Sequence, residues 1–201
     1  MQYSKCNPCS EFEHKKNILY ETDNLFVIPS IGQITIEGYL LICSKKHYIA
    51  IGEFPENFFP ELQSLQKKVR KVLSENYDIP IFFEHGPISP SKRGGSSVEH
   101  AHLHAVPINI DILDDLSKVF QPRSIDSFVS LKQQFQTGAP YLFYENPAGH
   151  KYVFSVPEVI PSQYIRWTIA VKIGATDRWD WKQWPGIEEF NKTLEKLKNK
   201  F

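Results

Sequence analysis

The sequence predicts an α+β fold in which an antiparallel β-sheet is flanked by helices and followed by a C-terminal α/β extension. Short runs of β-prone residues come first, a single long amphipathic helix pattern follows, and two further strand patterns enclose a loop rich in Gly, Pro and Ser. The chain has 201 residues, of which 41% are hydrophobic and 13% aromatic, so it can build a substantial core. This composition excludes a wholly disordered chain.

The first half of the chain is predicted to hold the sheet and its main helix. The four β-type runs are residues 18–20, 25–29, 33–37 and 39–43. Turn residues separate them, which is typical of an antiparallel meander. Apolar residues then recur at steps of three and four, which predicts a helix over 56–76. Strands are expected at 81–84 and 98–108, joined by the loop 86–97.

The pattern changes beyond residue 110, so we predict a first domain over 1–110 and an extension over 111–201 that packs on it. The expected elements of the extension are helices near 112–120 and 124–137, a hairpin over 141–154, a helix between Pro161 and Gly174, and a final helix over 187–201. We find no internal repeat and no low-complexity linker.

Charge and apolar patterning narrow the class of partner. Lys plus Arg number 23 and Asp plus Glu number 23, so the formal charge is zero and the pI is about 7.1. This balance argues against a stable complex with nucleic acid or an acidic membrane, because such binding needs clustered positive charge. The longest strongly apolar run has five residues, far fewer than a membrane span. Three cysteines are too few for a disulfide framework, and we expect a cytoplasmic protein.

The most informative stretch holds three histidines in strict alternation, His100, His102 and His104. Alternate residues of a strand face the same side, so the three imidazoles are predicted to share one surface. Such a row fits metal ligation, or nucleophilic catalysis by one neutral imidazole that the others orient.

The loop before these histidines favours attack on phosphorus. Gly94, Gly95, Ser96 and Ser97 offer backbone N–H groups and two hydroxyls that can bind a phosphate, and Lys92 and Arg93 lie next to them as counter-charges. His85 is a further candidate for phosphate binding, with a structural role as the alternative.

The stretch His100-Ala-His102-Leu-His104-Ala-Val106 resembles the signature of the histidine triad (HIT) family of nucleotide hydrolases and transferases. The Gly-Gly-x-Ser lead-in and the Gly38-Tyr-Leu-Leu-Ile strand, followed by Lys-His47, are similar to HIT features as well, so the resemblance covers about residues 6–110. The segments Pro161-Ser-Gln-Tyr and Asp177-Arg-Trp-Asp-Trp resemble tails of some HIT and diadenosine-polyphosphate phosphorylase-like proteins.

The resemblance implies a catalytic site of His100, His102, His104 and Ser97. In it, His102 is the nucleophile that takes the nucleotidyl phosphorus, His104 steadies the phosphate, and Ser97 bonds a phosphate oxygen or the leaving group. HIT proteins pair two domains into a continuous sheet, so the resemblance also implies a homodimer, with the helix over 56–76 supplying part of the contact.

A metal site is predicted near the N-terminus. Cys6 and Cys9 have the spacing of a zinc knuckle and supply half of a tetrahedral site. Similarity to zinc-containing HIT proteins and to galactose-1-phosphate uridylyltransferases implies His47 and His100 as the other two ligands of a structural zinc. His14 is the rival third ligand, and a redox dithiol is the alternative to a metal.

These observations lead to one preferred function and two alternatives. We expect a hydrolase of nucleotide phosphoanhydrides or phosphoramidates, with dinucleoside polyphosphates preferred, that acts through nucleotidyl-His102. The first alternative is a nucleotidyltransferase or phosphorylase that passes the same intermediate to phosphate or a sugar phosphate. The second is a non-catalytic nucleotide- or zinc-binding module.

Overall fold

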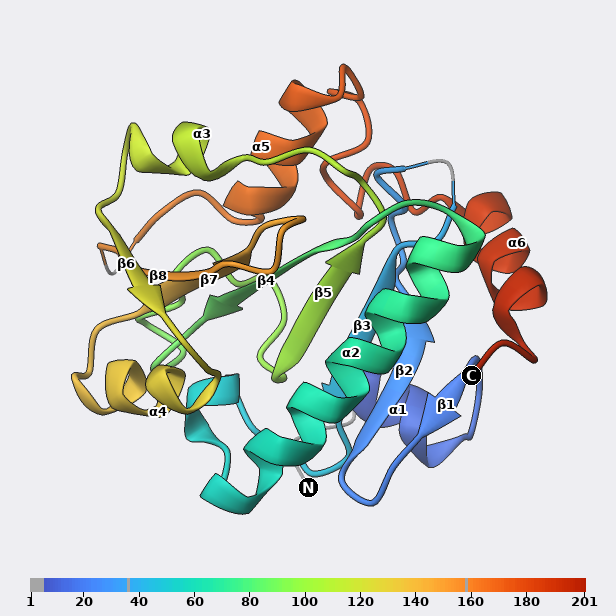
Figure 1. The fold of residues 1–201 in the computed structure, drawn as a ribbon, viewed down its shortest axis with the longest axis horizontal. Coiled ribbons are helices and arrows are strands. Elements are labelled where there is room, and N and C mark those ends of the chain that lie inside the picture. Colours follow the sequence, from blue (N-terminus) through green and yellow to red (C-terminus); the bar gives the residue numbers. More distant parts are fainter. Residues whose placement is uncertain (1–5, 36, 158) are drawn as a thin grey trace.

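A single antiparallel sheet organises the molecule (Figure 1). The computed structural model describes residues 6–35, 37–157 and 159–201. The strands are β1 (Tyr20–Glu21), β2 (Leu25–Pro29), β3 (Leu40–Ser44), β4 (Ile81–Gly86), β5 (His102–Val106), β6 (Pro122–Ile125), β7 (Tyr141–Glu145) and β8 (Lys151–Ser155). Their order across the sheet is β1-β2-β3-β5-β4-β7-β8-β6, and every neighbouring pair is antiparallel.

Helices cover both faces of this sheet, which confirms the α+β class. They are α1 (Asn7–Glu13), α2 (Phe59–Asn76), α3 (Leu113–Ser117), α4 (Val129–Gln136), α5 (Tyr164–Lys172) and α6 (Ile187–Leu197), with 3₁₀ turns η1 (Ile51–Glu53) and η2 (Glu56–Phe58). In the part of the chain that the structure describes, no helix is both long and apolar enough to cross a membrane.

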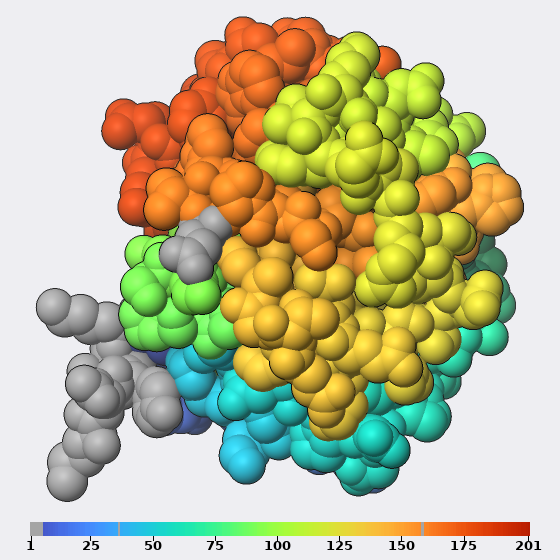
Figure 2. Space-filling model, turned by 90° about the vertical axis from the view of Figure 1, so that its left-hand side faces the viewer, coloured from blue at the N-terminus to red at the C-terminus, as the bar shows by residue number. Residues whose placement is uncertain are grey.

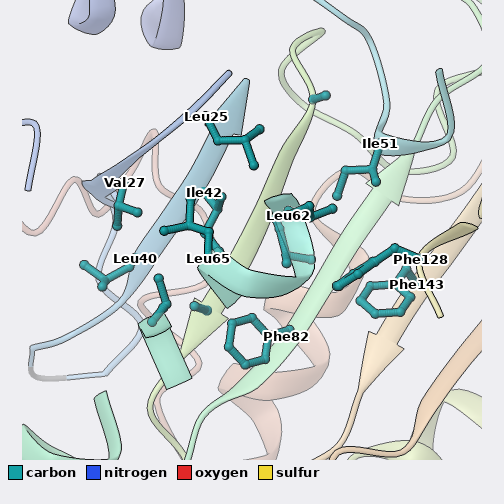
Figure 3. Close-up of a cluster of buried hydrophobic side chains, with 14 of the residues drawn as sticks. Leu25, Val27, Leu40, Ile42, Ile51, Leu62, Leu65, Phe82, Phe128 and Phe143 are labelled. Carbon is teal, nitrogen blue, oxygen red and sulfur yellow. The ribbon is translucent and has the colours of Figure 1, made fainter. Parts of the chain in front are cut away.

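The largest core lies between α2 and the sheet. Pro60 occupies the first turn of α2, where its missing N–H leaves no bond unmade. Leu62 and Leu65 of α2 are almost fully buried, and each such side chain stabilises the fold by about 1.5–3 kcal/mol. Figure 3 shows these leucines together with side chains of β2, β3 and β4 and with Phe128 and Phe143 of the C-terminal half. The two halves of the sequence therefore share one core.

The extension continues the sheet of the first half. β7 pairs with β4 along five residues, from Phe82 opposite Glu145 to Gly86 opposite Tyr141. Alternate residues of β4 face opposite sides, so Phe82 joins the core under α2, while Phe83 joins a second core with Ile165 and Ile169 of α5. In Figure 2 the extension, coloured from yellow-green to red, covers most of the visible face. β4 is consequently an interior strand, and the edges of the sheet are β1 and β6.

Three sequence predictions need correction. The described residues of 33–37 form no strand, because the Gln33 side chain bonds the backbone of Ser30 and Tyr39 and holds a loop instead; residue 36 lies outside the described residues. The helix predicted over 124–137 begins only at Val129, since residues before it pair with β8 as β6. The strand predicted over 98–108 is limited to β5, so His100 precedes it.

Candidate active site and metal centre

A cleft lies over β5 on the side of the sheet that bears His102 and His104. β3, the loop before β5, α1 and the C-terminal segment surround it. The lining residues are Asn7, Pro8, Glu11, Asn17, Ile28, Pro29, Ser30, Ile31, Leu41, His85, Gly95, Ser96, Ser97, Val98, His102, His104, Gln163, Arg166, Trp181 and Phe190.

His102 is half-buried and carries a fixed tautomer. Its Nδ1 lies 2.5 Å from the carbonyl oxygen of His100, and because a carbonyl can only accept, Nδ1 must carry the proton. In the neutral ring the lone pair is then on Nε2. Burial, with the nearby charge of Arg166 as a smaller cause, holds the pKa of His102 below its ordinary value. The strand thus presents a neutral imidazole with an available nitrogen.

His104 lies beside His102 and is almost fully buried. The two rings meet edge to face with centroids 4.5 Å apart, and His104 stacks on Phe83 at 4.2 Å. His104 Nδ1 is 2.6 Å from the hydroxyl of Tyr39, a residue with no exposed surface. Burial lowers the pKa of His104 well below its ordinary value, with smaller contributions from His102 and His85. His104 is therefore neutral and held in place by Tyr39.

His85 lies on the same face of the sheet, at the back of the cleft. Its Nε2 accepts a hydrogen bond from the backbone N–H of Ile165 at 3.2 Å, so the first turn of α5 holds its ring. Burial lowers the pKa of His85 to about 3, and the neighbouring His102 and Arg166 add to this shift. The structure thus places His85 in the lining, with one nitrogen already bonded to protein; its role in phosphate binding stays a prediction.

The glycine-serine loop reaches the cleft through Gly95, Ser96 and Ser97. Gly95 has a φ of +80°, and an added Cβ would come within about 3.1 Å of the carbonyl oxygen of Pro161, so glycine is needed there. Ser96 Oγ donates to the carbonyl of Val98, whereas Ser97 Oγ accepts a bond of 3.2 Å from the Trp181 indole. The Ser97 hydroxyl proton is therefore available to a ligand.

The other predicted phosphate ligands are not in the cleft lining. Gly94 lies one residue before that lining, and a Cβ added there would come within 2.9 Å of the Pro140 side chain. Arg93 forms an exposed ion pair of 2.9 Å with Glu99, and Lys92 sits in the turn closed by its backbone bond to Ser89. Among the described residues, neither of these two cations lines the cleft.

The four predicted metal ligands come together in one cluster. Donor atoms of Cys6, Cys9, His47 and His100 all lie within 4.8 Å of one another. The sulfur-to-Nδ1 distances are 3.3 Å for Cys6 and His100, 3.4 Å for Cys9 and His47, and 3.4 Å for Cys9 and His100. A tetrahedral metal with ordinary Zn–S and Zn–N bonds would separate such atoms by about 3.6 Å. This cluster could bind a metal.

The surroundings of the cluster suit metal binding as well. His100 Nε2 donates to the carbonyl of Ser44 at 2.7 Å, which leaves the Nδ1 lone pair directed at the two sulfurs. Burial and the adjacent Cys6 raise the pKa of the Cys9 thiol to about 12 when no cation is present. A bound cation would offset this cost. His14 is exposed, bonds the carbonyl of Ser10, and is not in the cluster.

Several lining residues were not predicted from the sequence. Gln163, Arg166 and Trp181 belong to the C-terminal extension, and Asn7 and Glu11 belong to α1. The Pro161-Ser-Gln-Tyr and Asp177 to Trp181 segments were noted for their resemblance to other tails, and that signal pointed to the right region. Their arrival in the cleft depends on the β4 to β7 pairing, which the sequence pattern did not reveal.

Comparison with known proteins decides the family. Residues 5–119, more than half of the chain, match the family model described as scavenger mRNA decapping enzyme C-term binding. The chain belongs to the HIT family. Its HIT part is of the decapping-enzyme C-terminal type, and it is 23% identical over 120 residues to a bis(5'-adenosyl)-triphosphatase of Dictyostelium discoideum, covering 56% of this chain and 78% of that relative.

Solved structures of HIT proteins are similar to part of the chain. A zinc-bound histidine triad family protein from Mycobacterium smegmatis is 21% identical, with 67% of this chain and 92% of that chain covered and a TM-score of 0.44. A hypothetical histidine triad nucleotide-binding protein from Sulfolobus tokodaii is 22% identical, with 66% and 91% covered and a TM-score of 0.45.

Proposed function

We propose that this HIT protein hydrolyses a nucleotide phosphoanhydride or phosphoramidate, with a dinucleoside polyphosphate as the preferred substrate, through a nucleotidyl group on His102. The observation that carries the proposal is the bond from His102 Nδ1 to the His100 carbonyl, which leaves Nε2 as a nucleophile in a cleft. Distant similarity to an enzyme named bis(5'-adenosyl)-triphosphatase supports the substrate class.

The reaction has two displacements at phosphorus. His102 Nε2 attacks the nucleotidyl phosphorus and a P–N bond forms. The bond from phosphorus to the leaving group, P–O in an anhydride and P–N in a phosphoramidate, breaks with its electron pair going to the leaving oxygen or nitrogen. Water then attacks the same phosphorus, the P–N bond breaks, and its electron pair returns to Nε2, which releases a nucleoside monophosphate and a proton. Splitting one displacement into two easier steps is the advantage of covalent catalysis.

Neighbouring groups support both steps. With the Tyr39 hydroxyl as donor to His104 Nδ1, the proton of neutral His104 lies on Nε2 and can bond a phosphate oxygen. The Ser97 hydroxyl accepts from Trp181 and can donate to another oxygen or to the leaving group. Preorganised donors of this kind stabilise the charge that develops on phosphorus-bound oxygens.

The test is a substitution of the nucleophile. His102→Ala should lower the turnover of the best substrate by about 10⁴-fold or more, as removal of a covalent nucleophile does elsewhere. His104→Ala should lower it less, and His150→Ala, which removes an exposed histidine from the β7 to β8 turn, should leave it unchanged. Wild-type protein should also yield an acid-labile nucleotidyl adduct on the peptide that contains His102.

A screen of possible substrates should test diadenosine polyphosphates and nucleoside phosphoramidates. Each is incubated with the protein in the presence and in the absence of inorganic phosphate, and the products are identified by mass spectrometry. Release of a nucleoside monophosphate in both conditions supports a hydrolase. A nucleoside diphosphate that appears only with phosphate would indicate the phosphorylase alternative. Near-normal turnover by His102→Ala would refute the covalent mechanism.

We also propose that the metal is a structural zinc. Two sulfurs and two imidazole nitrogens form a donor set that zinc prefers, and four protein ligands leave no open position for substrate. Its contribution would be to tie α1, which carries Cys9, to His100 next to the catalytic strand.

A further inference from the structure

We propose that Arg166 of the C-terminal extension binds the phosphate groups of the substrate. It lies on α5, outside the segment that matches the family model, and it lines the cleft together with His102 and His104. The inference rests on the proposed function for the kind of substrate, but the binding site itself can be tested separately.

Arg166 is a buried cation without a counter-charge. Arg166 is 3% exposed to solvent. Among the described residues, no carboxylate forms an ion pair with its guanidinium. Burying a charge is costly unless a group of opposite charge or several hydrogen bonds compensate. Backbone carbonyls and the Tyr39 ring compensate part of this cost, and an anionic ligand would supply the opposite charge.

The backbone bonds of the guanidinium involve two of its three nitrogens. Nε donates to the carbonyl of Trp179 at 2.9 Å, and Nη2 donates to the carbonyls of Gly32 at 2.8 Å and Arg178 at 3.5 Å, which fixes the plane of the group. The guanidinium carbon lies 5.2 Å from the centre of the Tyr39 ring. Within the described chain, Nη1 donates to no backbone carbonyl. A guanidinium held in this way is suited to phosphate oxygens.

The position of Arg166 matches the place where a phosphate must lie. Tyr39, on which the guanidinium rests, is the residue that contacts His104, so the cation and the two histidines surround one region of the cleft. Ser97 reaches the cleft from the glycine-serine loop, tied by Trp181 to the same C-terminal segment. A phosphate beside His102 Nε2 could thus be bonded from the loop, from His104 and from Arg166.

A structural role is the alternative, because Arg166 also joins the loop at Gly32 to the segment at Trp179. The two roles differ in what they do to a ligand without phosphate. Loss of a phosphate ligand weakens phosphate-bearing ligands alone, whereas a loosened cleft weakens nucleoside and nucleotide equally.

The experiment measures binding to the full-length, zinc-loaded protein by calorimetry, with inorganic pyrophosphate, AMP and adenosine as probes. Arg166→Gln should weaken pyrophosphate and AMP by about 10- to 100-fold, the range for a charged hydrogen bond, and leave adenosine unchanged. Arg166→Lys, which keeps the charge, should give intermediate affinities. The matched control is Arg123→Gln, whose side chain bonds Gln134 and does not line the cleft.

Three results would overturn the inference. The first is a pyrophosphate affinity that does not change in Arg166→Gln. The second is an equal loss of affinity for AMP and for adenosine in both the glutamine and the lysine variant, and the third is that the wild type binds neither pyrophosphate nor AMP. Failure of the proposed function would give a different set of results. Pyrophosphate would then bind in an Arg166-dependent way while no nucleotide in the screen is turned over.

Discussion

The carboxyl of Glu84 should make the stability of this protein depend on pH. Glu84 is on β4 but faces away from the cleft, where it is 1% exposed. Its oxygens accept bonds from the Ile51 backbone N–H at 2.6 Å and from the Tyr141 hydroxyl at 2.7 Å. Burial raises its pKa to about 7, although these two hydrogen bonds act in the opposite direction.

The direction and the size of the change in stability with pH follow from this pKa. The unfolded chain binds the Glu84 proton with a pKa near 4.5, so at pH values between 4.5 and about 7 the folded state holds a proton that the unfolded state has lost. The contribution of this carboxyl is fully present below pH 4.5 and is lost as the pH rises through 7. The loss is about 1 kcal/mol between pH 6 and pH 8 and about 3 kcal/mol in total.

The assay compares wild type with Glu84→Gln, which is neutral at every pH and can still accept the Ile51 N–H. The free energy of unfolding from urea titrations at fixed zinc should favour the variant by about 1 kcal/mol more at pH 8 than at pH 6. Other titrating groups cancel in this difference. Glu56→Gln, at an exposed position of η2, is the control and should give a constant difference. A pH-independent difference for Glu84→Gln would refute the reasoning.

Two further predictions concern the metal and the assembly. Metal analysis of the purified protein should give about one zinc per chain. Cys6→Ser should lose most of this zinc and melt at a lower temperature, because one ligand is removed. Cys43→Ala, which removes a buried thiol outside the cluster, should keep the zinc. Full zinc occupancy in Cys6→Ser would contradict the assigned ligands. The homodimer implied by the family stays a prediction. A dimer that continues the sheet must use one of its edge strands, β1 or β6. Light scattering should give twice the chain mass of 23.3 kDa, and a mass equal to that of a single chain would contradict the prediction.

Local spacing predicted the parts of the site that depend on a short stretch of chain. Two residues separate Cys6 from Cys9, and alternation along one strand places His102 and His104 on one face, so both features are visible in the sequence. His47 and His100 could be assigned only through a family resemblance, since they are distant in sequence from the cysteines. The structure brings all four donor groups within 4.8 Å.

The elements that were wrong show where local patterns lose to tertiary pairing. Residues of β6 were predicted as the start of a helix, but their backbone groups pair with β8 at the edge of the sheet. The sequence pattern around Gln33 does not distinguish a strand from a loop. Its side-chain amide stabilises the loop by hydrogen bonding to three backbone groups.

The role suggested for Arg166 could not be predicted for the same reason. On α5 it stands between Ile165 and Trp167, and nothing in this stretch of sequence marks it as a residue that binds a ligand. It reaches the cleft because β7 pairs with β4, which brings the chain after β8 back over the face that carries the histidines.

The pairing of β4 with β7 also explains how one cleft can combine chemistry and selectivity. The proposed nucleophile, His102, and its tautomer depend on β5 and on the His100 carbonyl, which belong to the HIT part of the chain. The indole over Ser97 and the buried guanidinium come from residues after 160, in a segment that shares its core with Phe83 of β4. Because the extension pairs with β4, the strand beside β5, its side chains reach the cleft that His102 lines. Under the proposed function, a substitution in the extension is therefore expected to change which ligand binds without altering His102.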